Sequence, residues 1–265
     1  MRRLITGYSN PTVKFLRSLR EKKHRKASGK FLAEGLRLLT DARASGHSPE
    51  LLVMATGREP HALLDTLETE VLAAGGEVLE MSTDLLGKVT GKDNPQAVAG
   101  VYAEFDTALT AIDRSSAKIW LVAQALRDPG NLGTMLRTGD AVGAGGLILL
   151  DDCADPFSVE AVRASMGAVF TQKIAQARWD EFLPWLRGGP GQLVAASLRE
   201  AVDYRGAPYA APCFLLVGNE SRGLPEEYEA ACDLRVTIPM NGRADSLNAA
   251  VAAAVLAYEA LAALG

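Results

Sequence analysis

The chain has 265 residues, of which 48% are hydrophobic and 23% charged, and its formal net charge is −4. This composition predicts one large or two modest globular domains, and no apolar run reaches the ~20 residues that a membrane-spanning helix needs. The N-terminus lacks a secretory signal pattern, and three widely spaced cysteines (Cys153, Cys213 and Cys232) exclude both a complete disulfide framework and a zinc-binding spacing, so we expect a cytoplasmic protein without a metal.

The first predicted element is a helix over 11–26, which lies in the most basic part of the chain. Residues 1–30 hold ten Lys or Arg and one acid, a net +9, whereas the other 235 residues hold 18 bases and 31 acids, a net −13. A charge run is usually a solvated helix face, but this excess favours contact with a nucleic-acid backbone. The bases that we expect to contact this backbone are Lys14, Arg17, Arg20, Lys22, Lys23, Arg25, Lys26 and Lys30.

The rest of the first segment is predicted to alternate between helices and strands. Helices are expected over 31–45 and 61–74, and strands over 51–54, 78–81 and 97–105. The apolar face of the helix over 31–45 would consist of Phe31, Leu32, Leu36, Leu38 and Leu39. A polar stretch over 106–116 predicts a linker, so residues 1–105 are expected to form a small domain of helices and strands.

The second domain, over 117–265, shows a more regular alternation that is typical of an α/β fold. Strands are predicted over 118–123, 146–150, 193–197, 213–217 and 234–238, and helices over 131–142, 158–169, 179–186 and 246–263. Such alternation implies a mainly parallel sheet covered on both faces. Ligands of such sheets bind beyond the carboxyl ends of the strands. The pattern alone predicts an open sheet without a knot.

Two residues of the loop and helix after the strand over 118–123 are candidates for chemistry. Asn131 and Arg137 form an Asn-x-Gly-x-x-x-Arg pattern. Each has a simpler interpretation, because Asn131 is suited to cap a helix and a lone Arg on a helix is usually a solvated charge. Their combination after a predicted strand favours a functional role for both.

Two further loops follow predicted strands. The first begins Gly218-Asn219-Glu220, where the glycine lets a ligand approach the backbone closely. The second runs from Ile238 through Met240 to Ser246-Leu247-Asn248, at the expected start of the last helix. A helix N-terminus presents free backbone N–H groups to a ligand. Capping of that helix is the simpler role for Ser246 or Asn248, and one residue can do both.

In this order, the three loops resemble motifs 1, 2 and 3 of the SpoU/TrmH family of RNA ribose 2′-O-methyltransferases, which belong to the SPOUT class. The resemblance covers roughly residues 117–265 and implies S-adenosylmethionine as cofactor, a deep trefoil knot and a homodimer formed through the C-terminal domain. It further implies an ion pair between Arg137 and Glu220. The implied catalytic set is Arg137, Asn131, Glu220, Ser246 and Asn248, and the implied cofactor-binding set is Gly218, Ile238, Leu247, Asn219 and Met240.

The chemistry of such a transfer requires a ribose hydroxyl to attack the methyl group of a sulfonium. The hydroxyl needs its proton drawn away or its developing charge stabilised. All three histidines (His24, His47 and His61) lie in the first segment, so Arg137 is the candidate. It would act either as the base or as a fixed guanidinium fork that grips phosphate and stabilises the oxygen.

The first segment resembles the small α/β/α substrate-binding domain that precedes the catalytic domain in many SpoU enzymes. Ser9-Asn10-Pro11 before the basic helix and the run Phe31-Leu-Ala-Glu-Gly-Leu-Arg37 carry this resemblance. It favours large-subunit ribosomal RNA as the substrate over transfer RNA. The alternatives are an RNA-binding protein without activity and a nucleotide-dependent oxidoreductase. The latter is disfavoured because the glycines near 143 follow a predicted helix rather than a strand.

Overall fold

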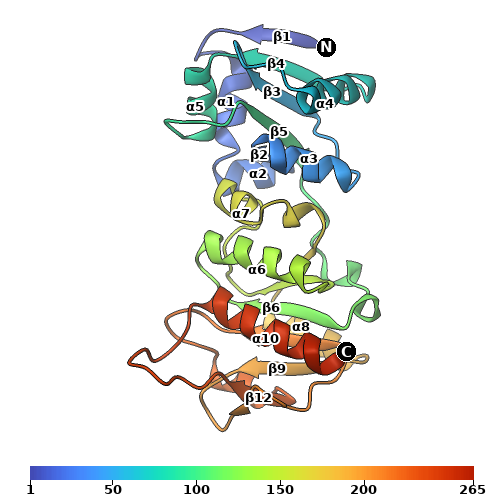
Figure 1. Cartoon of the computed structure of the whole chain (residues 1–265), viewed down its shortest axis with the longest axis vertical. Coiled ribbons are helices and arrows are strands. Elements are labelled where there is room, and N and C mark those ends of the chain that lie inside the picture. Colours follow the sequence, from blue (N-terminus) through green and yellow to red (C-terminus); the bar gives the residue numbers. More distant parts are fainter. The chain divides into compact units, whose positions relative to one another are not determined.

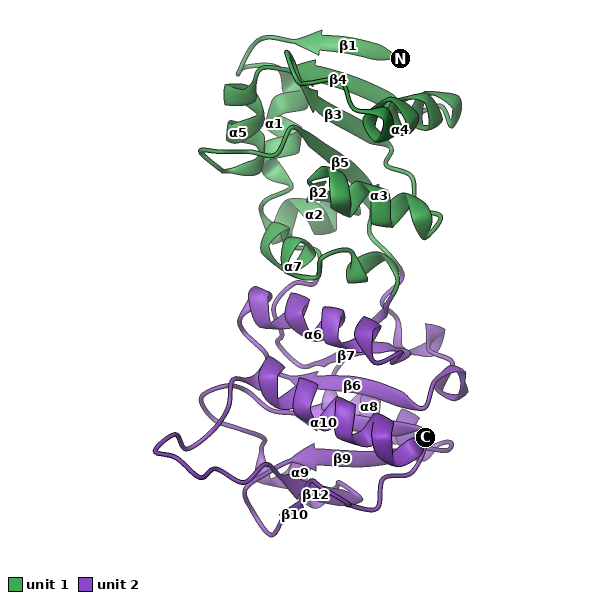
Figure 2. Cartoon of the chain, in the orientation of Figure 1, with its two compact units in different colours: residues 1–105, 157–171 green, residues 106–156, 172–265 purple.

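The computed structural model describes all 265 residues, which divide into two compact units (Figure 2). Unit 1 consists of residues 1–105 and 157–171, and unit 2 consists of residues 106–156 and 172–265. Residues 157–171 therefore pack with unit 1, although the sequence places them in the second domain. None of the helices combines the length and the apolar composition that a bilayer crossing requires.

Unit 1 is a five-stranded mixed sheet with helices around it (Figure 1). Its strands are β1 (Arg2–Ile5), β2 (Lys30–Glu34), β3 (Leu51–Ala55), β4 (Glu77–Met81) and β5 (Val98–Ala103), in the order β1-β4-β3-β5-β2. Its helices are α1 (Pro11–Ser18), α2 (Lys22–Ser28), α3 (Leu36–Ala44), α4 (Ala62–Ala73), α5 (Thr83–Thr90) and α7 (Val159–Ala164). Strand β5 pairs antiparallel with both β2 and β3.

Two predicted helices of unit 1 differ from the structure. The helix expected over 11–26 is two helices, because the chain turns between α1 and α2, where the buried Arg25 donates from Nη1 to the Leu19 carbonyl oxygen at 2.8 Å. The helix expected over 31–45 is wrong in its first part. Residues Lys30–Glu34 form β2, and Gly35, with φ of +112°, separates this strand from α3. Pairing with β5 overrides the helical spacing of the leucines.

An aromatic cluster explains why residues 157–171 belong to unit 1. The rings of Phe157 and Phe170 lie 5.1 and 5.9 Å from the ring of Phe31 on β2. Tyr102 of β5 lies 4.8 Å from Phe170, and Phe105 contacts the same rings. Burial of large aromatic side chains contributes strongly to a core. This cluster attaches the later segment to the N-terminal sheet.

Unit 2 is built on a seven-stranded sheet in which all pairs are parallel. Its strands are β6 (Ile119–Gln124), β7 (Gly146–Leu150), β8 (Lys173–Ala177), β9 (Gln192–Ala196), β10 (Val202–Asp203), β11 (Cys213–Val217) and β12 (Leu234–Thr237), in the order β10-β12-β9-β11-β6-β7-β8. Its helices are α6 (Pro129–Ala141), α8 (Trp179–Arg187), α9 (Glu226–Ala230) and α10 (Ala249–Leu264).

The core of unit 2 places the three loops at one edge of the sheet. Strand β11 is fully buried between β6 and β9, and α10 packs against it. Helix α10 also packs against α6, and the two helices lie over β6 (Figure 1). Short 3-10 turns occupy the expected linker over 106–116, and its Ile112 is buried, so this stretch packs as part of unit 2. The sequence patterns did not predict β1, α5, β8, β10 or α9.

Candidate active site

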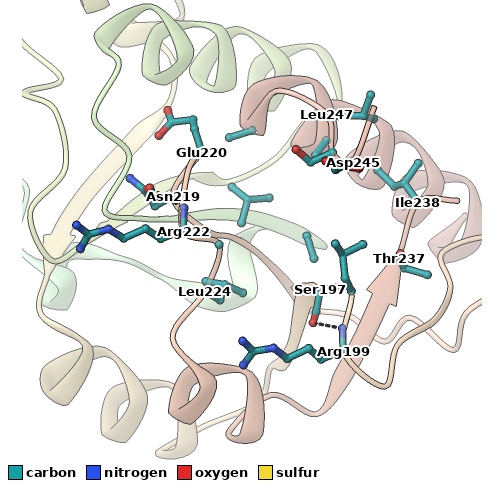
Figure 3. A pocket seen from close by; sticks show the side chains of 18 of the residues that line it. Ser197, Arg199, Asn219, Glu220, Arg222, Leu224, Thr237, Ile238, Asp245 and Leu247 are labelled. Atoms are coloured by element: carbon teal, nitrogen blue, oxygen red, sulfur yellow. Dashed lines mark hydrogen bonds between the residues drawn. The ribbon is translucent and has the colours of Figure 1, made fainter. Parts of the chain in front are cut away.

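A cavity of about 410 Å³ lies where β9, β11 and β12 end (Figure 3). These strands are parallel neighbours, so their carboxyl ends meet at one edge of the sheet. The walls come from residues 196–199 after β9, 217–224 after β11, Glu229 of α9, and parts of 236–252 around β12 and α10. Seven predicted site residues line it: Gly218, Asn219, Glu220, Ile238, Met240, Ser246 and Leu247. Asn131, Arg137 and Asn248 lie outside the lining.

The loop after β11 is folded back tightly on itself. A β-carbon at Gly218 would lie 2.5 Å from the carbonyl carbon of Gly223, so only glycine fits there. The Asn219 side-chain oxygen accepts from the backbone N–H groups of Ser221 and Arg222 at 3.0 and 3.1 Å. Its Nδ2 donates to the Ala125 carbonyl oxygen at 2.9 Å. Asn219 therefore fixes the loop to the residue that follows β6, as well as facing the cavity.

A chain of side-chain hydrogen bonds joins residues from all three predicted motifs. Asn248 donates from Nδ2 to Oδ1 of Asn131 at 2.9 Å, and Asn131 donates from Nδ2 to Oε1 of Glu220 at 3.1 Å. Each amide orientation is fixed by its partners, because a carboxylate can only accept. The chain therefore ends on a carboxylate beside the cavity.

The structure differs from the sequence interpretation of Asn131 and Ser246 as helix caps. Asp128 caps α6 by accepting from the Asn131 N–H at 2.7 Å, which leaves the Asn131 side chain for Glu220 and Asn248. The last helix begins at Ala249 rather than at Ser246. Its N-cap is Asn248, whose Oδ1 accepts from the N–H groups of Ala250 and Val251. Asn248 thus has a capping role and a role in the amide chain.

Arg137 stands apart from this hydrogen-bonded chain. It is exposed on α6, about 9 Å along the helix axis from Asn131 at 1.5 Å per residue. The expected ion pair between Arg137 and Glu220 is not formed, because Glu220 is bonded to Asn131 instead. Arg137 has no hydrogen bond or ion pair within this chain, so its five donors face solvent. Such a group is available to a phosphate or to another chain.

The residues of the cavity wall fit a nucleoside-containing sulfonium. Ile238, Met240 and Leu247 are half-buried and form an apolar side suited to an adenine ring. The tight turn at Gly218 brings backbone close to the cavity. Ser197, Thr237 and the acids Glu220, Glu229 and Asp245 supply polar atoms around it, as a ribose and a positive sulfonium require. No cluster of three His, Cys, Asp or Glu side chains is close enough to hold a metal ion.

Comparison with known proteins agrees with this arrangement. Residues 118–258 match the model of the SpoU rRNA Methylase family, and residues 10–100 match an MRM3-like substrate binding domain. This chain belongs to the SpoU rRNA methylase family. The matched range begins one residue before β6 and ends within α10, so it includes all three motif loops.

Relatives of this SpoU protein match it over almost its whole length. It is 32% identical to the 23S rRNA (guanosine(2553)-2′-O)-methyltransferase RlmP of Bacillus subtilis, over 96% of this chain and 97% of the relative. It is 32% identical to a 23S rRNA (uridine(2479)-2′-O)-methyltransferase of Streptomyces viridochromogenes, over 89% and 84%. An AdoMet-bound rRNA methyltransferase from Sinorhizobium meliloti superposes with a TM-score of 0.92 at 40% identity, covering 100% of this chain and 99% of that one.

The basic residues of the SpoU protein's unit 1 divide into exposed and structural groups. Lys14, Arg17, Arg20, Lys22, Lys23 and Lys26 are exposed on α1 and α2 or in the turn between them. Arg25 is only 2% exposed and bonds to the Leu19 carbonyl, so the prediction that it contacts RNA is wrong. Lys30 forms an ion pair with Glu50 at 2.5 Å.

Sequence reasoning missed some residues that the structure brings to these surfaces. Lys88 is exposed on α5, which packs against α1, and it was overlooked because α5 was not predicted. Ser197, Arg199 and Glu229 also line the cavity. Neither β9 nor α9 carries a recognisable motif there, so only the strand order could reveal them.

Proposed function

We propose that this chain transfers the methyl group of S-adenosylmethionine to the ribose 2′-hydroxyl of a nucleotide in large-subunit ribosomal RNA. The observation that supports it most is the meeting of the cavity with the Asn248–Asn131–Glu220 chain of hydrogen bonds at one edge of the sheet. Two relatives that match most of the chain are named as 23S rRNA 2′-O-methyltransferases. Related structures contain AdoMet, which is the cofactor of this enzyme class.

The residues of the site divide the work of transfer. When bound, the cofactor supplies an electrophilic methyl group on a positively charged sulfur. Ile238, Met240 and Leu247 exclude water from its apolar part, and Gly218 permits close backbone contact. Glu220 and the two asparagines form a rigid polar edge, because each side chain is held by its neighbour. Such pre-organised dipoles stabilise developing charge without reorganising.

Arg137 is proposed to orient the substrate rather than to act as a neutral base. A guanidinium stays charged in proteins, and the Arg137 side chain has no partner within its own chain. Its planar fork can grip an RNA phosphate and stabilise the 2′-oxygen as the hydroxyl loses its proton to water or to that phosphate. The six exposed bases of α1, α2 and the turn between them are proposed to hold the RNA backbone during this step.

The active form is proposed to be a homodimer formed through unit 2, in the cytoplasm. Val251 and Tyr258 are 48% and 55% exposed on α10, and a separation of seven residues places them on one helix face. An apolar face of this kind is costly in water and suits a second copy of the chain. The knot in unit 2 stays a prediction. Sedimentation of a Tyr258→Lys variant as a monomer would support this interface, and a normal dimer would reject it.

The function is tested by mapping 2′-O-methylated positions in total RNA from cells with and without the gene. The expected result is that RNA from cells without the gene lacks one 2′-O-methylated position in the large-subunit ribosomal RNA. Incubation of that RNA with the purified protein and cofactor should restore the methylation. Loss of a position in transfer RNA instead would reassign the substrate. If no methylated ribose changes and the pure protein binds no S-adenosylhomocysteine, the methyltransferase assignment is rejected.

A further inference from the structure

A buried carboxylate in the cavity wall has no role in the proposed transfer. Glu229 of α9 is only 6% exposed, and its Oε1 accepts from the Ser197 hydroxyl at 2.7 Å. Its Oε2 is buried without any hydrogen-bond donor. The nearest cation is Nη1 of Arg199 at 3.7 Å, beyond hydrogen-bond reach, and the Arg199 side chain is 63% exposed. The carboxylate therefore has one satisfied and one unsatisfied oxygen.

The surroundings of Glu229 hold it in place. The preceding residue, Tyr228, donates to Oδ2 of Asp151 at 3.0 Å and stacks on Trp179 with 3.8 Å between ring centroids. Ser197 is also fully engaged, since its oxygen accepts from the Arg199 N–H at 2.9 Å. Neither α9 nor the end of β9 is thus free to turn and satisfy Oε2. Burial of an unpaired carboxylate oxygen is costly, so a donor from outside the chain is expected.

The place of Glu229 indicates which donor this is. Figure 3 shows Ser197 and Arg199 across the cavity from Glu220, where the amide chain marks the reacting end. An ammonium group is a poor candidate, because it would compete with the Arg199 guanidinium for the same negative charge. The amine of an adenine is also a poor candidate, because the adenine ring is expected against the apolar side of the cavity at Ile238 and Leu247. A ribose diol is neutral and offers two donors, and carboxylates hold ribose hydroxyls in other nucleotide sites.

We propose that Glu229 accepts a hydrogen bond from a ribose hydroxyl of the bound cofactor and so anchors the adenosine half away from the reacting end. This inference rests on the proposed function, because it takes S-adenosylmethionine as the occupant of the cavity. Ser197 orients the carboxylate through Oε1, and Arg199 partly balances its charge. Glu229 is then a cofactor-specificity residue that distinguishes a ribose from a deoxyribose.

The test is calorimetric binding of S-adenosylhomocysteine and its 2′-deoxy and 3′-deoxy analogues to the full-length protein. The wild type should bind at least one analogue about tenfold to a hundredfold more weakly, the range expected for a hydrogen bond to a charged acceptor. Glu229→Leu should bind S-adenosylhomocysteine more weakly by a similar factor and should no longer distinguish the analogues. Glu227→Gln, at an exposed position of the same helix, is the matched control and should behave as the wild type.

Each outcome decides a separate point. Equal affinity of the wild type for all three ligands would overturn the inference while leaving the methyltransferase assignment intact. A Glu229→Leu variant that binds weakly but still discriminates would show that the carboxylate only supports the wall, which also overturns it. Absence of any binding by the wild type would reject the proposed function itself. If thermal denaturation shows that the variant does not fold, the wild-type analogue series decides alone.

Discussion

Three polar side chains proposed to function in unit 2 are hydrogen-bonded to one another, whereas the bases proposed to contact RNA in unit 1 are exposed to solvent. In unit 2, Asn131, Glu220 and Asn248 come from distant parts of the sequence and hold one another at 2.9–3.1 Å. In unit 1, the six exposed bases proposed to contact RNA belong to two consecutive helices, α1 and α2, and the turn between them. The first arrangement suits chemistry, because geometry must be fixed before reaction. The second suits a polyanion, because phosphate attraction depends on charge density more than on exact placement.

The largest effect that would test this comparison concerns Arg137, a motif side chain that lies outside the hydrogen-bonded chain of Asn248, Asn131 and Glu220. Arg137→Ala should reduce methyl transfer by about 10²–10³-fold, as expected for a lost transition-state contact, with unchanged S-adenosylhomocysteine affinity. Arg137→Lys should also be poor, since a point charge does not reproduce a planar fork. Single-turnover methylation assays measure the loss. Lys173→Ala, at an exposed cation on β8, is the control. Near-normal turnover of the Lys variant would reject the bidentate role.

A second prediction uses the fact that all three cysteines lie in unit 2. Burial raises the pKa of the Cys153 thiol to about 11 and those of Cys213 and Cys232 to about 12, from a reference of 9.0. The thiolate is the reactive form, so at pH 8 alkylation should be about a hundredfold slower at Cys153, and about a thousandfold slower at Cys213 and Cys232, than for a free thiol.

The same shifts have a consequence for stability. The raised pKa values mean that the cysteine contribution to stability is fully present below pH 9 and is lost as the pH rises from 9 through about 11 for Cys153 and about 12 for Cys213 and Cys232. The control for the alkylation rates is Thr69→Cys, which places a thiol at an exposed position on α4 of unit 1. This thiol should be alkylated quickly, and its rate should not depend on the packing of unit 2. Fast labelling of the native cysteines at pH 8 would contradict the packing of unit 2.

The third prediction separates the two roles of Asn248. Asn248→Asp keeps an oxygen that can cap α10 but cannot donate to Asn131, so activity should fall about tenfold with little change in melting temperature. Asn248→Ala removes both the capping oxygen and the donor to Asn131, so it should also lower the free energy of unfolding by about 1 kcal/mol. Calorimetry and transfer assays on both variants distinguish these effects. Full activity in the Asp variant would show that the amide chain is dispensable.

The smallest effects are expected in unit 1, where contributions are spread over many bases. Replacing Lys14, Lys22 and Lys23 by Ala should lower the salt dependence of RNA binding by up to ~0.9 unit per lost contact and leave cofactor affinity unchanged. Arg25→Ala should instead lower the melting temperature of unit 1, because it removes a buried bond to the Leu19 carbonyl. Filter binding at several salt concentrations gives the slope. An unchanged slope would make the basic helices a solvated surface.

Local patterns predicted most strands of unit 2 because each is a short apolar run, and all of these except β6 lie close to a glycine or proline. They were less useful in unit 1. Phe31 and Leu32 fit a helical spacing, yet their backbone pairs with β5, 70 residues later in the chain. Strand β1 was not predicted, because its residues Arg2 and Arg3 are polar and its pairing with β4 spans most of the unit. The periodicity of apolar residues indicates which side chains are buried, but it does not indicate which strand pairs with the segment that carries them.

The sequence by itself determined the family, because three loops with specific residues follow strands in a fixed order. It also determined the charge division, since counting Lys and Arg needs no coordinates. Only the tertiary structure decided that Glu220 bonds to Asn131 instead of Arg137, that Arg25 is buried, and that Glu229 faces the cavity. These facts depend on which strands are neighbours in the sheet and on how α9 packs. They arise from contacts between residues far apart in the chain, which no local spacing records.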